Sequence, residues 1–268
     1  MMKITATEIF KSIELIRCQS PVVHNITNYV VMNNTANALL AIGASPVMAH
    51  AEEEVEEMVN IASALVINIG TLSEYWINSM FKAARQARKK GIPVILDPVG
   101  AGATAYRTKT ARDLIHSEPP AVIRGNASEI MALYDDKSKT KGVDSAASSE
   151  AAIDMARRLS ETHHCVVCVS GPTDYIVDKE KILKIKNGHP MMSRVTGLGC
   201  TASALCGAFA AVERQPFAAT AEAMAVMGIA GEMAAEAASG PGSLQTYFLD
   251  DLYRLSEDDI HRRLKVED

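Results

Sequence analysis

Short apolar segments that alternate with segments of helical periodicity constrain the fold of this chain more than any other feature. Residues 64–69 (ALVINI) and 165–170 (CVVCVS) are almost continuously apolar, and each follows a segment with the spacing of an amphipathic helix. Strands that are apolar along their whole length are typical of parallel sheets buried on both faces. The alternation therefore predicts an α/β protein with a mostly parallel central sheet covered by helices on both sides.

Helix and strand signals place most of the elements. Asn28 is the expected cap of a helix over 29–42, and Gly43 its expected end. Residues 181–186 with Asn187 and Gly188 predict an antiparallel hairpin at an edge of the sheet. Apolar periodicity predicts helices at 8–18, 29–42, 52–61, 73–90, 150–161, 200–214, 218–239, 244–254 and 257–265, and strands at 64–69, 93–96, 121–124 and 165–170.

The length of the chain bounds its domain organisation. A chain of 268 residues can bury a substantial core, and no internal repeat, low-complexity tract or linker divides this one. We expect residues 1–268 to form a single domain; two domains are the weaker alternative.

Composition excludes several classes of protein. Hydrophobic residues make up 48% of the chain and charged residues 22%, which is typical of a folded domain rather than a disordered one. The net charge of −5 provides no basic field for nucleic acid or an anionic membrane. The apolar region at 217–239 is interrupted by Glu222, Glu232 and Glu236, which argues against a membrane span. With no secretory signal pattern near the start, we expect a cytoplasmic protein with no nucleic-acid or membrane partner.

Five cysteines stand mostly in apolar runs, which argues against a disulfide framework. Cys165 and Cys168 have the C-x-x-C spacing, but residues three apart on a strand point to opposite faces. No second cysteine pair follows at zinc spacing. We therefore interpret both as core residues rather than as metal ligands or a redox pair.

Polar residues stand where predicted strands end. Asp97 follows one apolar strand, and Arg124 ends the next, just before Asn126 and Glu129. Ligands of parallel sheets gather at the carboxyl ends of the strands. A carboxylate there can hold Mg²⁺, and a guanidinium can bind phosphate with two hydrogen bonds. The alternatives are structural: Asp97 as a turn residue, Asn126 as a helix cap and Glu129 as a first-turn acid.

Residues 195–200 (VTGLGC) place two glycines at the start of an Ala-rich helical segment. The free amides and the dipole at a helix N-terminus favour an anion, so this turn is a candidate phosphate site with Cys200 beside it. The alternative is a tight turn before a helix whose small residues serve close packing, with Cys200 in the core.

Six motifs in a fixed order carry a family resemblance that covers nearly the whole chain. The chain resembles the hydroxyethylthiazole kinase family of the ribokinase-like superfamily in residues 23–28, 43–48, 68–71, 96–104, 123–129 and 195–200. The resemblance implies a three-layer α/β/α domain and a homotrimer with active sites at subunit interfaces. It also implies ATP-dependent phosphorylation of the hydroxyl of 4-methyl-5-(2-hydroxyethyl)thiazole, a step of thiamine salvage.

The same resemblance implies roles for individual residues. It suggests that Asn28, Met48 and Gly197 bind the thiazole, that Arg124, Ser170 and Gly199 bind ATP, that Asp97 and Glu129 act through Mg²⁺, and that Cys200 is the catalytic base. Ser170 stands where the family often has Thr, and it keeps the hydroxyl. Leu198 replaces a more usual small residue, and we expect it to narrow the space above the amides of the turn.

The chemistry expected of Cys200 is proton acceptance from the substrate hydroxyl. Its pKa should fall at a helix N-terminus, although bound ATP would oppose this fall. Other readings remain open at this point: a ribokinase-like hydroxymethylpyrimidine kinase, a nicotinamide-cofactor hydrate dehydratase, a silent nucleotide sensor, or a thiol hydrolase with His24 or His189 as its base.

Overall fold

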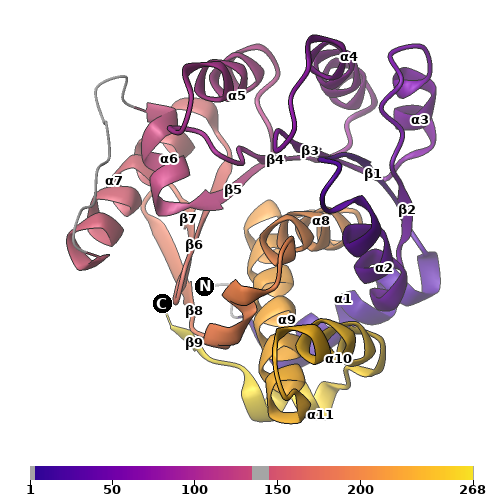
Figure 1. Cartoon of the computed structure of the whole chain (residues 1–268), viewed down its shortest axis with the longest axis vertical. Coiled ribbons are helices and arrows are strands. Elements are labelled where there is room, and N and C mark those ends of the chain that lie inside the picture. The colour runs from indigo at the N-terminus through magenta and orange to yellow at the C-terminus, as the bar shows by residue number, and fades with distance from the viewer. Residues whose placement is uncertain (1–3, 135–144, 268) are drawn as a thin grey trace.

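A nine-stranded sheet runs through the protein in the order β2-β1-β3-β4-β5-β6-β7-β8-β9 (Figure 1). The computed structural model describes residues 4–134 and 145–267. The six strands from β2 to β6 are parallel, and β7 to β9 are antiparallel. The strands are β1 (Val22–Ile26), β2 (Ser45–Val47), β3 (Ala64–Asn68), β4 (Val94–Asp97), β5 (Val122–Asn126), β6 (Val166–Ser170), β7 (Asp174–Asp178), β8 (Lys181–Ile185) and β9 (Val266–Glu267).

Helices cover both faces of the sheet, as the apolar strands predict (Figure 1). One face carries α3 (Val55–Ile61), α4 (Glu74–Lys90), α5 (Ala105–Ser117), α6 (Ala127–Tyr134) and α7 (Ser145–His163). The other carries α1 (Ala6–Gln19), α2 (Met32–Ile42), α8 (Leu198–Ala210), α9 (Pro216–Ala237), α10 (Pro241–Arg254) and α11 (Glu257–Arg263), with the short 3₁₀ helix η1 (Pro190–Arg194) near them. The predicted α/β class with a mostly parallel sheet is confirmed.

Alternate side chains of each strand enter different cores. On β3, Val66 packs in the core with α8, whereas Leu65 packs in the core with α4. Cys165, just before β6, and Cys168, in the middle of β6, likewise lie in opposite cores as free thiols. Their interpretation as core residues is confirmed.

Helix α8 lies very close to the middle of the sheet because its residues are small. A Cβ on Gly207 would lie 2.7 Å from Val66 Cγ2 of β3 and 3.1 Å from Val23 Cγ1 of β1. Ala204 and Ala208 are fully buried on the same helix. This close packing fixes the start of α8 against the carboxyl edge of the strands.

Three local predictions are wrong in detail. Helix α2 begins at Met32 and has no side-chain cap; Asn28 Oδ1 instead accepts a hydrogen bond from Val30 N at 3.1 Å, which makes a turn before the helix. The antiparallel hairpin joins β7 to β8, so Asn187 and Gly188 follow the hairpin rather than form its turn. Strand β8 is also not at the edge of the sheet, because β9 pairs with its other side. Helix α8 begins at Leu198, with Gly197 as its N-cap residue.

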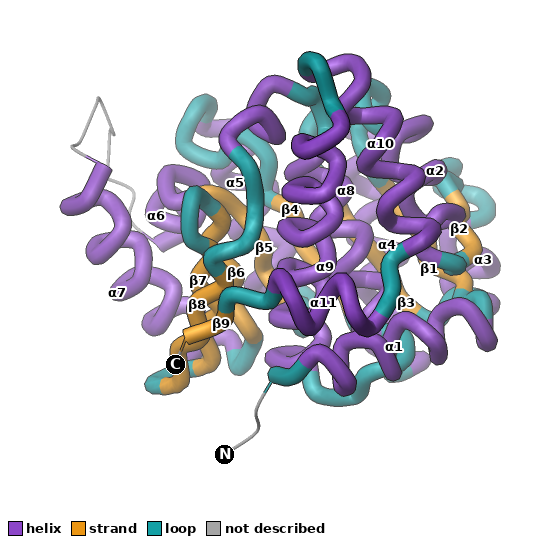
Figure 2. The backbone as a smooth tube through the Cα atoms, turned by 90° about the horizontal axis from the view of Figure 1, so that it is seen from below, coloured by secondary structure: helices purple, strands orange, loops and turns teal. Residues whose placement is uncertain are grey.

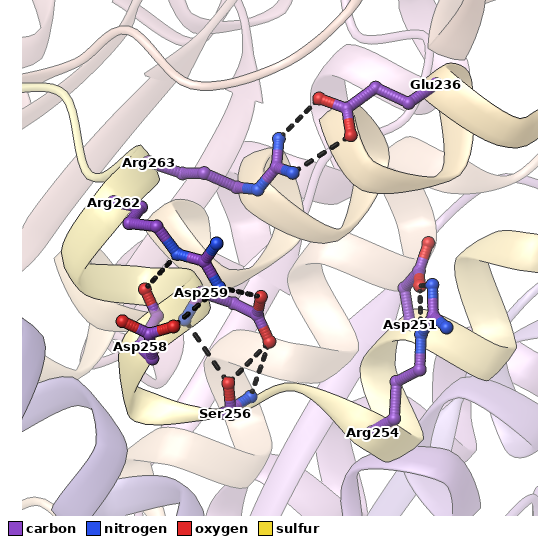
Figure 3. Close-up of polar contacts among 8 residues, drawn as sticks. All are labelled: Glu236, Asp251, Arg254, Ser256, Asp258, Asp259, Arg262 and Arg263. Carbon is purple, nitrogen blue, oxygen red and sulfur yellow. Dashed lines mark hydrogen bonds and ion pairs between the residues drawn. The ribbon is translucent and has the colours of Figure 1, made fainter.

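Figure 3 shows an ion pair between α9 and α11 and further ion pairs within α10 and within α11. Arg263 of α11 pairs with both carboxylate oxygens of Glu236 on α9, at 2.6 and 2.9 Å. Arg254 pairs with the buried Asp251 one turn earlier on α10. Figure 2 shows α11 beside α1 and α9, so the ion pair between Arg263 and Glu236 lies in the helix layer on the other side of the sheet from α4.

Within the described residues, no helix is both long and apolar enough to span a membrane.

Glu222 of α9 is buried against α1, and its charge destabilises the fold. Its Oε2 has no partner within the described residues, and burial raises the pKa of Glu222 to about 7 although Ser12 hydrogen-bonds to it. Because the pKa of Glu222 is higher in the folded protein than in the unfolded chain, the folded state binds this proton more tightly. The protein therefore loses stability as the pH rises from 4.5, the pKa in the unfolded chain, through about 7, the pKa in the folded protein.

We therefore expect Glu222→Gln to stabilise the protein at pH 8.5 by about 1–3 kcal/mol more than at pH 5. Urea denaturation at both pH values measures this difference. The exposed Glu57, changed to Gln, controls for the loss of one negative charge. An equal effect of Glu222→Gln at the two pH values would contradict the assignment.

Candidate active site

Polar side chains from four parallel strands meet at the carboxyl edge of the sheet. Asn68 of β3 stands opposite Asp97 of β4 in the strand register, and Asn126 of β5 stands opposite Ser170 of β6. Asn28 lies just beyond the end of β1 and is also buried. The candidate residues therefore share one edge because parallel strands end together.

Asp97 is a fully buried carboxylate at the centre of this edge. Its Oδ2 accepts hydrogen bonds from Asn68 Nδ2 at 2.9 Å and from Ser203 Oγ at 2.8 Å, and it lies 4.0 Å from Arg124 Nη1. Burial raises the pKa of Asp97 to about 6, with Glu129 also raising it and Arg124, Ser203 and Asn68 lowering it. Its Oδ1 has no hydrogen-bond partner within the described residues.

Arg124 joins the centre of the site to β6. Its Nη2 donates to Ser170 Oγ at 2.7 Å, and Ser170 Oγ donates to Gly125 O at 3.2 Å. The Arg124 Nε is buried without a partner in the described part of the chain. A Cβ on Gly199 would lie 3.1 Å from Arg124 Nη1, so the guanidinium lies against the backbone of the glycine turn. Arg124, Ser170 and Gly199, the three residues predicted to bind ATP, thus lie together.

The glycine turn forms the N-terminus of α8. Gly197 has a φ of 85°, and a Cβ there would lie 2.8 Å from Val31 Cγ1, so a larger residue would be both strained and crowded. The first amides of a helix lack carbonyl partners within it, which leaves those of residues 198–200 available to an anion. Leu198 is buried in the core with α2 and α10, so the expectation that it narrows the space above the amides is wrong.

Cys200 lies half-buried in the first turn of α8, and Asn28 Nδ2 donates to its Sγ at 3.5 Å. Burial raises the pKa of the Cys200 thiol to about 11, with Asp97 raising it further, and hydrogen bonds from Asn68 and Asn28 oppose the rise. The predicted fall of this pKa is therefore wrong: desolvation and a nearby carboxylate outweigh the helix N-terminus.

The two histidines considered as bases for a thiol hydrolase make other contacts. His24 Nε2 bonds to Ala49 O at 2.8 Å, and burial lowers the pKa of His24. His189 caps η1, where its Nδ1 accepts from Met191 N. Neither gives Cys200 the hydrogen-bonded base that a thiol nucleophile requires.

Glu129 takes part in the cap of a helix and also lies near Asp97. Its Oε2 accepts from Asn126 N and its own N donates to Asn126 Oδ1, which makes the predicted helix cap at the start of α6. Its Oε1 accepts from Gly100 N at 2.9 Å. Among the described residues, no cluster of three or more His, Cys, Asp or Glu side chains is arranged to hold a metal ion.

Met48 follows β2, which is the edge strand beside β1, and is half-buried. It therefore stands at the same edge of the sheet as Asn28. Asn28 itself lies against the backbone of Gly70, where a Cβ would be 2.6 Å from Asn28 Nδ2. The loop after β3 thus needs glycine at this position to admit the Asn28 side chain.

The sequence predictions did not assign Asn68 and Ser203 to the site. Both are buried and both donate to Asp97. The position of Asn68 at the end of an apolar strand, level with Asp97, was a usable signal. Ser203 gave none, because a serine among alanines is equally suited to close helix packing.

Comparison with known proteins shows one family over nearly the whole chain. Residues 13–258 match the model of the "Hydroxyethylthiazole kinase family". A hydroxyethylthiazole kinase of Syntrophus aciditrophicus is 62% identical over 266 residues, covering 99% of this chain and 98% of that protein. The structure of a hydroxyethylthiazole kinase from Pyrococcus horikoshii superposes with a TM-score of 0.90 at 45% identity, covering 97% and 98% of the two chains.

A more distant structure supports the fold alone. A ribokinase-like superfamily protein from Enterococcus faecalis aligns with a TM-score of 0.62 at 14% identity over 88% of this chain and 87% of its own. The chain belongs to the hydroxyethylthiazole kinase family, a group of phosphotransferases, and has the ribokinase-like α/β fold.

Proposed function

We propose that the carboxyl edge of the sheet is where this chain transfers the γ-phosphoryl group of ATP to the hydroxyl of 4-methyl-5-(2-hydroxyethyl)thiazole. The observation that carries this proposal is the convergence of Asp97, Arg124 and the free amides of residues 198–200. Phosphoryl transfer depends mainly on positioned groups that stabilise charge on the transferring oxygens. The Arg124 guanidinium and the amides of residues 198–200 are donors that could surround a bound phosphate in this way.

Arg124 and the start of α8 would hold the phosphates of ATP. Ser170 supports this role through its hydrogen bond to Arg124, which aims the guanidinium at Gly199. The amides of residues 198–200 would bind the transferring group as its charge spreads over three oxygens. Direct contact between Ser170 and ATP is part of the same proposal.

The residues present fit a Mg²⁺ ion bound with ATP. Mg²⁺ takes one or two carboxylates, keeps several waters and binds substrate phosphates. The unpartnered, buried Oδ1 of Asp97 is an oxygen of this kind, and Glu129 is close enough to raise the pKa of Asp97. Asp97 and Glu129 would hold the ion, directly or through water, and the ion would neutralise charge on the phosphates.

Asn28, Met48 and Gly197 would line the thiazole pocket. Asn28 is held against Cys200, so a hydroxyl near Cys200 Sγ would also lie near the Asn28 amide. Cys200 would accept the hydroxyl proton as a thiolate. Since burial raises its pKa to about 11, only a small fraction is ionised at neutral pH, and its contribution is modest. A loose transition state needs little base, so the amides and Arg124 contribute more than Cys200.

The assembly and extent of the catalytic unit belong to the same proposal. We propose a homotrimer whose subunits meet beside the site, because Tyr29 and Val30 directly follow Asn28 and are 66% and 65% exposed. We also propose that residues 1–268 form one kinase domain, since the sheet takes strands from Val22 to Glu267. Five free cysteines are consistent with the proposed cytoplasmic location.

Thiazole-dependent formation of ADP in the presence of Mg²⁺ tests the proposed function. We expect Cys200→Ala to lower kcat by no more than about 10²-fold, the low end of the range for a general base, with little change in the KM for ATP, because the phosphate contacts remain. Cys200→Asp should stay active, since a carboxylate can accept the proton. Full kcat in Cys200→Ala would remove Cys200 from the mechanism, and turnover with a hydroxymethylpyrimidine but not the thiazole would overturn the assignment.

Alkylation with iodoacetamide tests the state of the Cys200 thiol. The thiolate is the reactive form, so with a pKa of about 11 the rate at Cys200 should still be rising at pH 10. Mass spectrometry of each cysteine peptide separates Cys200 from the exposed Cys18, and Cys200→Ser gives the background. A rate that reaches its plateau below pH 8.5 would contradict the assigned pKa.

Sedimentation equilibrium tests the assembly. We expect a mass of three times 28.8 kDa, and we expect Val30→Asp to weaken the trimer and to lower thiazole phosphorylation, because a charge would be buried in the interface. The exposed Ile61, changed to Asp, is the control for loss of an apolar surface residue. A monomer with full activity would show that the site is complete within one subunit.

A further inference from the structure

Asn68, the last residue of β3, connects the two halves of the proposed site. Its Nδ2 donates to Asp97 Oδ2 at 2.9 Å. Its Oδ1 accepts from Asn28 Nδ2 and from Gly70 N, both at 2.9 Å. The side chain is buried, with 1% of the residue exposed, so these contacts are not exchanged with water.

Backbone amides fix the orientation of both asparagines. A backbone N–H can only donate, so the atom of Asn68 that faces Gly70 N must be the amide oxygen. In the same way, Val30 N fixes the oxygen of Asn28 at 3.1 Å. The NH₂ of Asn28 therefore faces Asn68, and the NH₂ of Asn68 faces Asp97. The chain of hydrogen bonds has one direction, from Asn28 to the carboxylate.

This direction determines which oxygen of Asp97 is available. Oδ2 receives both Asn68 and Ser203, whereas Oδ1 has no partner in the described part of the chain. A carboxylate held by two donors on one oxygen cannot rotate without losing both in a buried site. Asn68 and Ser203 thus hold the carboxylate in one orientation, in which Oδ1 has no donor among the described residues.

The other end of the chain determines the surroundings of Cys200. An amide NH₂ has two hydrogens, and Asn28 gives one to Asn68 Oδ1 and the other to Cys200 Sγ. Without the acceptor on Asn68, the Asn28 NH₂ would keep only the long 3.5 Å contact to sulfur, and Val30 N would be the one remaining backbone contact that orients the amide. The placement of the Asn28 donor at Cys200 therefore depends on Asn68, which also hydrogen-bonds to the same thiol.

We propose that Asn68 is a positioning residue for phosphoryl transfer, one that orients the Asp97 carboxylate and the Asn28 amide together through a single side chain. The inference rests on the proposed function, because it assigns Asp97 and Asn28 to the phosphate and thiazole sides of one reaction. Asn68 itself touches neither substrate.

The test is the kinetics of Asn68→Ala in the full-length protein. Misplacing reacting groups by about 1 Å costs on the order of 10²-fold, so we expect a fall of about this size in kcat. The KM for ATP should change by less than about threefold, since Arg124, Ser170 and Gly199 keep their contacts. If Asn68→Ala does not fold, Asn68→Ser is used, because its hydroxyl is too short to join Asp97 and Asn28 at once.

Asn187→Ala is a matched control. Asn187 is also a buried asparagine that donates to a carboxylate, that of Glu232, and accepts from a backbone amide, that of Lys265. It joins β8 to α9 and the end of α11, none of which carries a residue of the site. We expect it to lower the melting temperature as much as Asn68→Ala does while leaving kcat within about twofold.

Two further measurements separate positioning from general loss of structure. In an Asn28→Ala background, Asn68→Ala should lower kcat by clearly less than about 10²-fold, because part of its effect acts through Asn28. The crystal structure of ligand-free Asn68→Ala should show the Asn28 amide turned from Cys200 Sγ.

Unchanged kcat in Asn68→Ala, or an equal loss of kcat in Asn187→Ala, would overturn the inference. Absence of thiazole phosphorylation by the unmodified protein would overturn the proposed function, and the inference with it.

Discussion

The burial of one carboxylate, that of Asp97, is the constraint on which the rest of the site depends. A buried carboxylate is costly unless donors surround it, and here Asn68, Ser203 and the more distant Arg124 supply them. Each donor comes from a different element: β3, α8 and β5. Satisfying this one charge therefore fixes how the start of α8 and the ends of two strands are placed. The remaining cost is visible in the pKa of Asp97, which burial raises to about 6.

The fold brings these groups together by simple geometry. Parallel strands end at one edge, so polar residues that follow each strand become neighbours although they are far apart in sequence. Helix α8 lies close to that sheet because Gly207 leaves no side chain between it and Val66. Its N-terminus then lies at the edge, with Gly197 in a left-handed conformation and Gly199 against Arg124. For this reason the amides of residues 198–200 and the Arg124 guanidinium lie next to each other.

The sequence predicted the architecture better than the local contacts. Short and almost continuously apolar strands such as 64–69, alternating with helical segments, are typical of a parallel sheet buried on both faces. Strand-end position likewise identified Asp97 and Arg124. Asn28 was misassigned as a helix cap because an asparagine before a helix has the same local signal whether it caps that helix or reaches another strand. The pKa of Cys200 was misjudged because burial and the field of Asp97 arise only from the tertiary structure.

The central claim is that phosphoryl transfer takes place at the N-terminus of α8. A crystal structure with Mg²⁺, a non-hydrolysable ATP analogue and the thiazole tests it most directly. The γ-phosphate should lie within hydrogen-bond distance of the amides of residues 198–200, with the thiazole hydroxyl between it and Cys200. Nucleotide bound instead in the cavity of about 860 Å³ at the opposite edge, lined by Arg88, His163 and Arg214 among others, would contradict the account.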